Sequence, residues 1–333
     1  MRIAITGSIA TDHLMAFPGR FADQLMPDQL ATVSLSFLVD DLEIRRGGVA
    51  ANIALGLGRL GLEPVLVGAV GADFGGYEVW LTRHGVDTES VRISTVSQTA
   101  RFMCTMDADR NQIASFYPGA MSEAREIELK PIADRVGGLD LVLVSPNDPE
   151  AMVLHTEECR ELGLPFAADP GQQIARMDGG ALLRLVDDAW VLFTNEYEAA
   201  LLCKNTGRTH DEILEGVGTW ITTLGADGVQ IERLGGKTKL VPAVPVADPV
   251  EPTGLGDAFR AGFLAATSWG IGMERAAQLG CALASVALGH IGPQGGELDI
   301  PVLVTTIRDC YGADAADELA PYLERLDEQV AAR

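Results

Sequence analysis

Apolar residues along the chain alternate between short continuous runs and longer segments of helical period. The runs Leu141-Val-Leu-Val144 and Trp190-Val-Leu-Phe193 are almost wholly apolar. Strands of this composition are typical of a sheet that helices cover on both faces. The pattern therefore predicts an α/β domain built around a buried sheet.

The predicted elements alternate regularly from residue 64 onward. Strands are predicted at 2–7, 64–69, 140–145, 165–169, 190–194, 220–224 and 228–233. Helices are predicted at 47–60, 75–84, 150–162, 175–187, 196–204, 209–217, 257–269, 273–288, 301–310 and 314–331. No linker, repeat or low-complexity segment divides the chain, so we expect one domain over residues 1–333.

Three further segments predict a small β-sheet that projects from this domain. Residues 13–31 show no regular pattern, but apolar side chains recur at every second position from Val33 to Val39. That alternation suits a strand with one covered face. Two more strands are predicted at 99–106 and 112–117, where they interrupt the helix–strand alternation.

The composition of the chain limits the kinds of molecule that it is expected to bind. A net charge of −22 argues against a nucleic-acid binder, and a bound polyphosphate would need help from helix termini, a few basic side chains and Mg²⁺. The five cysteines are scattered and form no CxxC, which favours a reduced protein over a disulfide or zinc framework. Because no signal peptide or membrane-spanning run is recognisable, we expect a soluble, cytoplasmic protein without a membrane partner.

The stretch Glu251-Pro-Thr-Gly-Leu-Gly-Asp257 opens a long apolar helix that is expected to end near Trp269. Glycines let backbone approach a ligand closely, and a helix N-terminus offers free amides that suit an anion. Asp257 would repel a merely bound phosphate, but it could take a proton from a hydroxyl while the amides of residues 253–256 hold a migrating phosphoryl group. The alternative is a capped helix, with Thr253 as N-cap and Asp257 favouring the helix dipole.

Other strand ends carry polar residues and glycines, and ligands of open α/β sheets gather at the carboxyl ends of strands. Asp12 lies just beyond the first strand, where a turn or cap role is the alternative. Gly48 and Asn52 lie at the start of a helix that presents free amides. The Gly56-Leu-Gly-Arg-Leu-Gly61 run later in that helix is not a dinucleotide fingerprint, because its glycines do not follow a strand.

Asn195 and Glu198 follow directly on a predicted strand and share one face of the next helix. They could hold Mg²⁺ through its waters, or they could form a variant of the capping box. No P-loop is present, since the Gly-Lys-Thr at 236–238 has Ile231 where the motif needs glycine. An ATP site would therefore need another architecture.

Two more strand ends have both a functional and a structural interpretation. Thr223, Gly225 and Gly228 could surround a phosphate, but they also suit a hairpin turn. Gln172 and Gln173 could bind the edge of a base, or they could remain solvated loop residues.

Taken in order, these motifs resemble those of the ribokinase family of carbohydrate and nucleoside kinases. The patterns are Gly7 to Asp12, Gly47-Gly48-x-x-x-Asn52-x-Ala54, Gly71-Ala-Asp73-Phe-Gly75, Asn195-x-x-Glu198, Thr223-x-Gly225-x-x-Gly228 and Thr253-Gly-x-Gly-Asp257. Residues 7–14, 115–124 and 169–173 also look like the actinobacterial adenosine kinases of this family. Glu251 and Leu255 depart from the family pattern, which usually has Asp and a small residue there.

The resemblance implies a three-layer α/β/α domain with a β-sheet lid formed by residues 13–45 and 97–119. It implies that ATP and Mg²⁺ serve to phosphorylate adenosine at its 5′-hydroxyl, giving AMP and ADP in purine salvage. Asp257 would be the base, and the backbone of Gly254, Leu255 and Gly256 would form an anion hole. Such a site suits phosphoryl transfer, which depends mainly on positioning and charge stabilisation.

The remaining site residues are expected from the same resemblance. The nucleoside is expected to contact Ser8, Asp12, Ser36, Gly48, Asn52, Phe102, Phe116, Met121, Gln172, Gln173 and Arg176. ATP is expected to contact Asn195, Thr223, Gly225 and Gly228, with Mg²⁺ held by Asn195 and Glu198 through water. Because exposed lid strands often pair with another chain, we also expect a homodimer through the lid.

Three alternatives are weighed against this interpretation. A sugar kinase of the ribokinase or fructokinase type would use the same Asp257 and glycines but would not need aromatic walls at residues 102 and 116. A non-catalytic nucleotide sensor would have no use for an acid beside phosphate, and a dehydrogenase would need a correctly placed glycine motif.

Overall fold

The main sheet of the domain contains eight strands in the order β14-β13-β12-β11-β10-β9-β1-β4. The computed structural model describes residues 1–25, 32 and 34–331. Six neighbouring strands are parallel, and β13 pairs antiparallel with both β12 and β14. The strands are β1 (Ile3–Thr6), β4 (Val65–Val67), β9 (Leu141–Val144), β10 (Phe166–Ala168), β11 (Val191–Asn195), β12 (Trp220–Thr223), β13 (Val229–Glu232) and β14 (Lys239–Val241).

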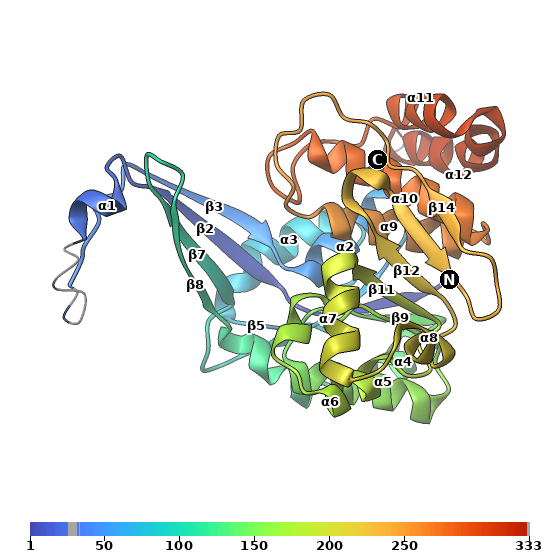
Figure 1. The fold of residues 1–333 in the computed structure, drawn as a ribbon, viewed down its shortest axis with the longest axis horizontal. Coiled ribbons are helices and arrows are strands. Elements are labelled where there is room, and N and C mark those ends of the chain that lie inside the picture. Colours follow the sequence, from blue (N-terminus) through green and yellow to red (C-terminus); the bar gives the residue numbers. More distant parts are fainter. Residues whose placement is uncertain (26–31, 33, 332–333) are drawn as a thin grey trace.

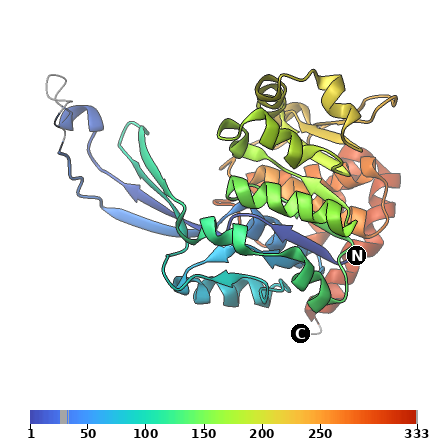
Figure 2. The same cartoon turned by 90° about the horizontal axis from the view of Figure 1, so that it is seen from below.

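Helices cover both faces of this sheet (Figures 1 and 2). One face packs against α2 (Val49–Arg59), α3 (Gly75–Arg83), α9 (Leu255–Ser268), α10 (Met273–Leu288), α11 (Ile300–Tyr311) and α12 (Ala313–Ala331). The other packs against α4 (Leu129–Val136), α5 (Pro149–Leu162), α6 (Gly179–Val186), α7 (Glu196–Thr206) and α8 (His210–Glu215).

Alternate residues of each buried strand enter the two cores. In β9, Leu141 and Leu143 join the core of one face, whereas Val142 and Val144 join the other. This period of two explains why the strands are apolar at every position. The three-layer α/β/α architecture predicted from the sequence is confirmed.

A second sheet projects from the main body in the order β3-β2-β7-β8 (Figure 1). We call this sheet the lid. Its strands are β2 (Ala10–Ala16), β3 (Asp41–Gly47), β7 (Ala100–Met106) and β8 (Gln112–Tyr117). β1 begins near the N-terminus, which lies on the side of the main body away from the lid in both views. The carboxyl ends of β1 and of the strands parallel to it therefore lie on the side of the lid.

The secondary structure predicted for residues 13–39 is wrong. Residues 10–16 form β2, and Phe21–Gln24 form the short helix α1, where no regular structure was expected. Residues 34–39, expected to be a strand, have no regular structure, and residues 26–31 and 33 lie outside the described residues. Phe37 packs on Phe17 and Phe21, with ring centroids 5.0 Å from each. The apolar pattern there therefore reflects one packed aromatic side chain and not a pleated strand.

Several short elements have no clear signal in the sequence. A two-stranded sheet pairs β5 (Ala69–Val70) with β6 (Arg92–Ile93). 3₁₀ turns occupy Ala72–Phe74, Gly119–Glu126, Gly171–Ala175 and Gly225–Asp227. Among the helices of the described residues, none has the length and hydropathy needed to cross a bilayer.

Candidate active site

A cleft of about 640 Å³ opens where the carboxyl ends of the strands meet the lid. It gathers side chains and backbone from segments that are far apart in the sequence. The predicted residues that line it are Ser8, Asp12, Gly48, Asn52, Phe116, Met121, Gln172, Gln173, Arg176, Gly254, Leu255, Gly256 and Asp257. Its volume is within the usual range for small-molecule sites.

The start of α9 presents free amides to this cleft. The first helical hydrogen bond runs from Ala258 N–H to the Gly254 carbonyl at 2.9 Å, so the amides of residues 255–257 have no acceptor within the helix. Gly254 has a φ of 83°, and a Cβ there would lie 2.4 Å from Cβ of Pro293. Glycine is therefore required at the N-cap, and Gly254, not Thr253, is the N-cap residue.

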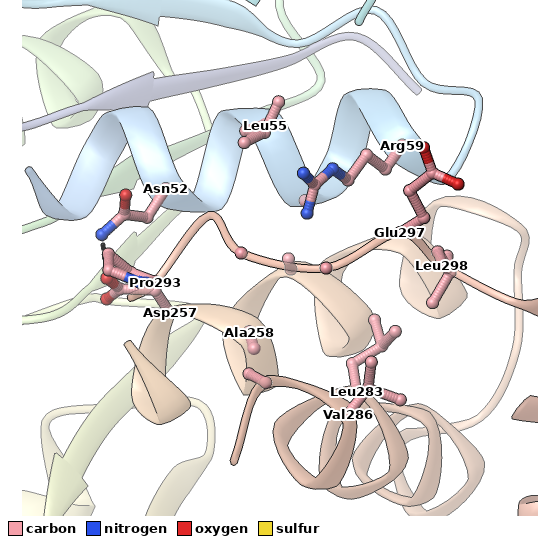
Figure 3. A pocket seen from close by; sticks show the side chains of 15 residues that line it. Asn52, Leu55, Arg59, Asp257, Ala258, Leu283, Val286, Pro293, Glu297 and Leu298 are labelled. Carbon is pink, nitrogen blue, oxygen red and sulfur yellow. Dashed lines mark hydrogen bonds between the residues drawn. The ribbon is translucent and has the colours of Figure 1, made fainter. Parts of the chain in front are cut away.

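Asn52 on α2 fixes the carboxylate of Asp257 (Figure 3). Its Nδ2 donates a hydrogen bond to Asp257 Oδ2 at 2.8 Å, and its Oδ1 accepts one from Gln294 Nε2 at 2.9 Å. Gln294 in turn accepts a hydrogen bond from the indole N–H of Trp80 at 3.1 Å. This chain of hydrogen bonds leaves Asn52 one amide orientation, with its N–H toward the acid.

Burial raises the pKa of Asp257 to about 6, although the hydrogen bond from Asn52 and the charge of Arg260 oppose the rise. The carboxylate thus has a pKa close to neutrality, which is favourable for a group that must accept a proton. Behind it lies a small cavity of about 60 Å³ whose lining also includes Arg59 and Glu297 (Figure 3).

The lid is tied to the α9 loop by an ion pair. Nη1 of Arg45 on β3 lies 2.8 Å from Glu251 Oε2, which also accepts a hydrogen bond from Gly292 N–H at 3.1 Å. Asp12 is the register partner of Arg45 on β2. Burial raises the pKa of Asp12, while the charge of Arg45 opposes this shift. Glu251, one of the two departures from the family pattern, therefore has a structural role at the mouth of the cleft.

The residues expected to contact ATP lie at the same edge of the sheet but beyond the cleft lining. Asn195 and Thr223 are register partners at the carboxyl ends of β11 and β12. Gly225 and Gly228 belong to the tight turn that joins β12 to β13, so this segment also forms the hairpin turn considered from the sequence. Their contact with nucleotide stays a prediction.

Asn195 and Glu198 form a complete capping box at the start of α7. The Asn195 amide donates to Glu198 Oε2, and the Glu198 amide donates to Asn195 Oδ1, both at 2.8 Å. The box uses only Oε2 of the carboxylate. Glu198 also acts electrostatically on Arg260 and Asp169, which lie behind the α9 N-terminus.

These donors fit an Mg²⁺ ion that is held mainly by water and phosphate. Within the described ranges, no group of three or more His, Cys, Asp and Glu side chains could hold a metal by itself. Mg²⁺ commonly takes one or two carboxylates and completes its shell with water and substrate phosphates. Glu198 is the carboxylate that could serve here, and its role with the metal remains a prediction.

Only some of the residues expected to surround a base line the cleft. Phe116 on β8 and Gln172 line the cleft and are exposed, whereas Gln173 is buried and donates from Nε2 to the Asn147 carbonyl at 2.7 Å. Phe102 on β7 is the register partner of Phe116, but it is not part of the cleft lining. Ser36 is an exposed loop residue that also lies outside the lining.

Three residues near Asp257 were not predicted from the sequence. Gln294 orients Asn52, and the hydroxyl of Tyr77 lies against Gln294 and donates to the Gly47 carbonyl at 3.0 Å. Arg260 lies one helical turn after Asp257, and its spacing of three residues was the one available signal. Nothing local in the sequence points to Gln294 or Tyr77.

A family profile described as pfkB family carbohydrate kinase matches residues 9–300. The match includes the lid strands, the edge of the sheet with its polar residues, and α9. The chain therefore belongs to the pfkB family of carbohydrate kinases.

Individual relatives include kinases of nucleosides and of sugars. A nucleoside kinase from Methanothermobacter thermautotrophicus is 32% identical over 270 residues, covering 80% of this chain and 86% of the relative. Ribokinase from Bacillus subtilis is 28% identical over 253 residues, covering 75% and 83%. The structure of Burkholderia thailandensis nucleoside kinase in complex with inosine is 35% identical, with a TM-score of 0.80 and coverage of 93% and 98%. The chain is thus an ATP-dependent kinase with the ribokinase-like fold.

Substituting Glu198→Gln separates its capping role from a role with magnesium. Glutamine can keep the capping box but lacks the charge that Mg²⁺ would use. We expect the Mg²⁺ concentration for half-maximal activity at fixed ATP to rise by about tenfold or more, with the melting temperature nearly unchanged. Glu212→Gln is the matched control, because Thr209 and Glu212 form a second capping box on α8. A magnesium curve identical to that of the wild type would leave Glu198 with capping alone.

Proposed function

We propose that this chain is an adenosine kinase, which transfers the γ-phosphoryl group of ATP to the 5′-hydroxyl of adenosine and releases AMP and ADP. The observation that carries the proposal is the position of Asp257. Its carboxylate lies in the cleft at the N-terminus of α9, whose first amides have no acceptor in the helix. A carboxylate and free backbone amides thereby lie close together, which supports a base beside an anion site.

The reaction follows from this arrangement. Asp257 accepts the proton of the 5′-hydroxyl as that oxygen attacks phosphorus, and the bond to the ADP oxygen breaks. The amides of residues 254–256 hold the oxygens of the migrating group, where fixed donors stabilise developing charge without reorganising. Asp12, Gly48 and Asn52 line the cleft beside Asp257 and are proposed to hold the ribose hydroxyls.

Magnesium and ATP would occupy the edge of the sheet beyond α9. When bound, Mg²⁺ held by Glu198 through water would neutralise charge on the nucleotide phosphates. Asn195, Thr223, Gly225 and Gly228 are proposed to contact the nucleotide, because Asn195 and Thr223 lie side by side at that edge. Closure of the lid over the cleft would exclude water and protect ATP from hydrolysis.

The choice of a nucleoside over a free sugar rests on the far part of the cleft. Phe116 and Gln172 line the cleft as well, and their ring face and amide are proposed to bind a planar base. Ribose or fructose would leave this part unfilled. Relatives named nucleoside kinases support the proposal, including the Burkholderia enzyme in complex with inosine, whereas the likeness to ribokinase supports the sugar-kinase alternative.

The proposed assembly is a homodimer through the lid. Edge strands β3 and β8 expose apolar side chains, with Leu42 at 53%, Ile44 at 59% and Ile113 at 47% exposed. Exposed apolar edge strands tend to pair with another chain. A second copy of this chain would cover them.

Replacing Asp257 with Asn should lower kcat by roughly 10²–10⁴-fold, because that is the usual contribution of a general base. Wild-type kcat/KM for adenosine should fall as the pH drops below about 6, where burial places the pKa of Asp257. The base works only when deprotonated, so activity is lost on the acid side. Steady-state rates between pH 5 and pH 9 measure both effects.

The thermal stability of Asp257→Asn provides the control for this prediction. Burial raises the pKa of Asp257 above its unfolded value, so this group costs the folded state stability as the pH rises from about 4 to about 6, and the cost persists at higher pH. Asp257→Asn should therefore melt no lower than wild type at pH 8. Near-normal kcat in this variant would remove Asp257 from the mechanism.

Replacing Phe116 with Ala should raise the KM for adenosine by about tenfold or more, since stacking of one base contributes roughly 1–3 kcal/mol. Tyr117→Ala is the matched control, because Tyr117 is the next residue on β8, so its side chain lies on the opposite face of the lid, and it is not part of the cleft lining. We expect it to affect all acceptors alike.

The deciding measurement is kcat/KM for adenosine, inosine, ribose and fructose with wild type and both variants. Adenosine should be the best acceptor of the wild type, and Phe116→Ala should reduce its advantage over ribose. A wild type that prefers ribose or fructose would overturn the nucleoside assignment in favour of the sugar kinase.

A further inference from the structure

A buried ion pair lies directly behind the proposed anion hole. Arg260, on the α9 turn after Asp257, is 8% exposed, and Asp169, at the carboxyl end of β10, is 2% exposed. Nη2 of Arg260 donates a hydrogen bond to Asp169 Oδ1 at 2.7 Å, and Nε lies 2.6 Å from Oδ2 without hydrogen-bond geometry. The Asp169 amide donates to the Val144 carbonyl at 2.8 Å, which anchors the acid to β9.

The third nitrogen of this guanidinium faces the anion hole. A Cβ at Gly256 would lie 2.7 Å from Arg260 Nη1. Nη1 therefore packs against the face of Gly256 where any other residue would carry a side chain. The guanidinium also lies over the ring of Phe193, 5.3 Å from its centroid. Asp169, Phe193 and Gly256 together leave Arg260 no other position.

The chemistry of the pair does not suit a purely structural role. A buried ion pair is poor evidence for stability, because desolvation of both charges offsets their attraction and apolar residues of similar size often do as well. A fixed positive charge behind a site that receives phosphate has another use, because it can stabilise negative charge on the phosphate. The effect is strong there because buried surroundings screen charge weakly. The protein as a whole carries a net charge of −22, so local positive charge is scarce.

We propose that Arg260 is a positioning residue for phosphoryl transfer: clamped by Asp169, its guanidinium holds the backbone of Gly256 in place and adds positive charge behind the anion hole. This inference rests on the proposed kinase mechanism but not on the identity of the acceptor. Arg260 acts through Gly256 and Asp257, and it forms and breaks no bond itself.

Arg260 also governs the proton affinity of the base. The charge of Arg260 lowers the pKa of Asp257, against the larger effect of burial. The other titratable groups that face Asp257 are Asp169 after β10, Tyr77 on α3, and Arg59 with Glu297 across the small cavity. Loss of the cation should therefore raise the pKa of Asp257.

The test compares Arg260→Met and Asp169→Asn with wild type. Arg260→Met should lower kcat by about 100-fold or more, the usual effect of losing one group that stabilises the transition state, while KM for the acceptor changes little. The acid limb of its kcat/KM profile should move to higher pH, whereas that of Asp169→Asn, which keeps the cation, should not. Arg260→Lys should restore part of the charge but not the two-point contact with Asp169.

A binding measurement adds a second readout. With ADP, Mg²⁺ and adenosine present, tetrafluoroaluminate mimics the migrating phosphoryl group. Arg260→Met should bind ADP as wild type does but should lose most of its affinity for ADP with tetrafluoroaluminate. Arg160→Met is the matched control, since Arg160 lies over the Phe166 ring at 5.1 Å on α5. It should change stability alone.

A single substitution leaves an unpaired buried charge and could prevent folding. The double variant Arg260→Met with Asp169→Asn leaves none, and we expect it to fold and to keep the low kcat of Arg260→Met. Near-normal kcat in the folded double variant, or limbs that move in the same direction in the two single variants, would overturn the proposal. A wild type that prefers a sugar would overturn the adenosine assignment only, because the Arg260 comparison can be made with either acceptor.

Discussion

The hydrogen bond from Asn52 to Asp257 is the contact on which the site depends. It joins the first turn of α2 to the first turn of α9, two helices that begin more than 200 positions apart in the sequence. A pKa of about 6 for Asp257 means that its surroundings disfavour the charged carboxylate by about 3 kcal/mol. A hydrogen bond to a charged group contributes about 1.5–3 kcal/mol. Without Asn52 the acid would remain protonated at still higher pH.

The parallel sheet makes this contact possible. Because β1, β9, β10, β11 and β12 all end at one edge, Ser8, Asn147, Asp169, Asn195 and Thr223 reach the same side of the domain. The order of strands then separates two regions. The ends of β1, β9 and β10 face the cleft under the lid, and those of β11 and β12 lie beyond it. In the proposed mechanism, the acceptor and the phosphate donor meet at the start of α9.

The buried layers of the fold were predictable and the lid was only partly so. Strands such as β9 and β11 are apolar at every position, because both faces are covered by helices, and this signal is local. The pairing of β2 with β3 and β7 is a long-range contact, and the mixed sequence of β2 carries no alternation that would reveal it. Likewise, residues 34–39 carry an alternating pattern without forming a strand.

The site was predictable where a motif carried it. Asp257 and its glycines stand out because they complete a series of motifs in family order, although the stretch alone also suits a capped helix. Gln294 and Tyr77 could not be found in this way, because Gln294 reaches Asn52 and Tyr77 only through the folded path of residues 291–298. The position of Arg260 one helical turn after Asp257 was a sequence signal for its role. Its partner Asp169 could not be found in the same way, because it follows β10, far from α9 in the sequence.

A crystal structure of the protein with adenosine and a non-hydrolysable ATP analogue tests the central claim most directly. The account predicts that the 5′-oxygen of adenosine lies within hydrogen-bond distance of the Asp257 carboxylate. The γ-phosphate analogue should lie at the amides that begin α9, with the adenine between Phe116 and Gln172. Adenosine bound elsewhere, or bound in the cleft with its 5′-hydroxyl turned away from Asp257, would contradict the account.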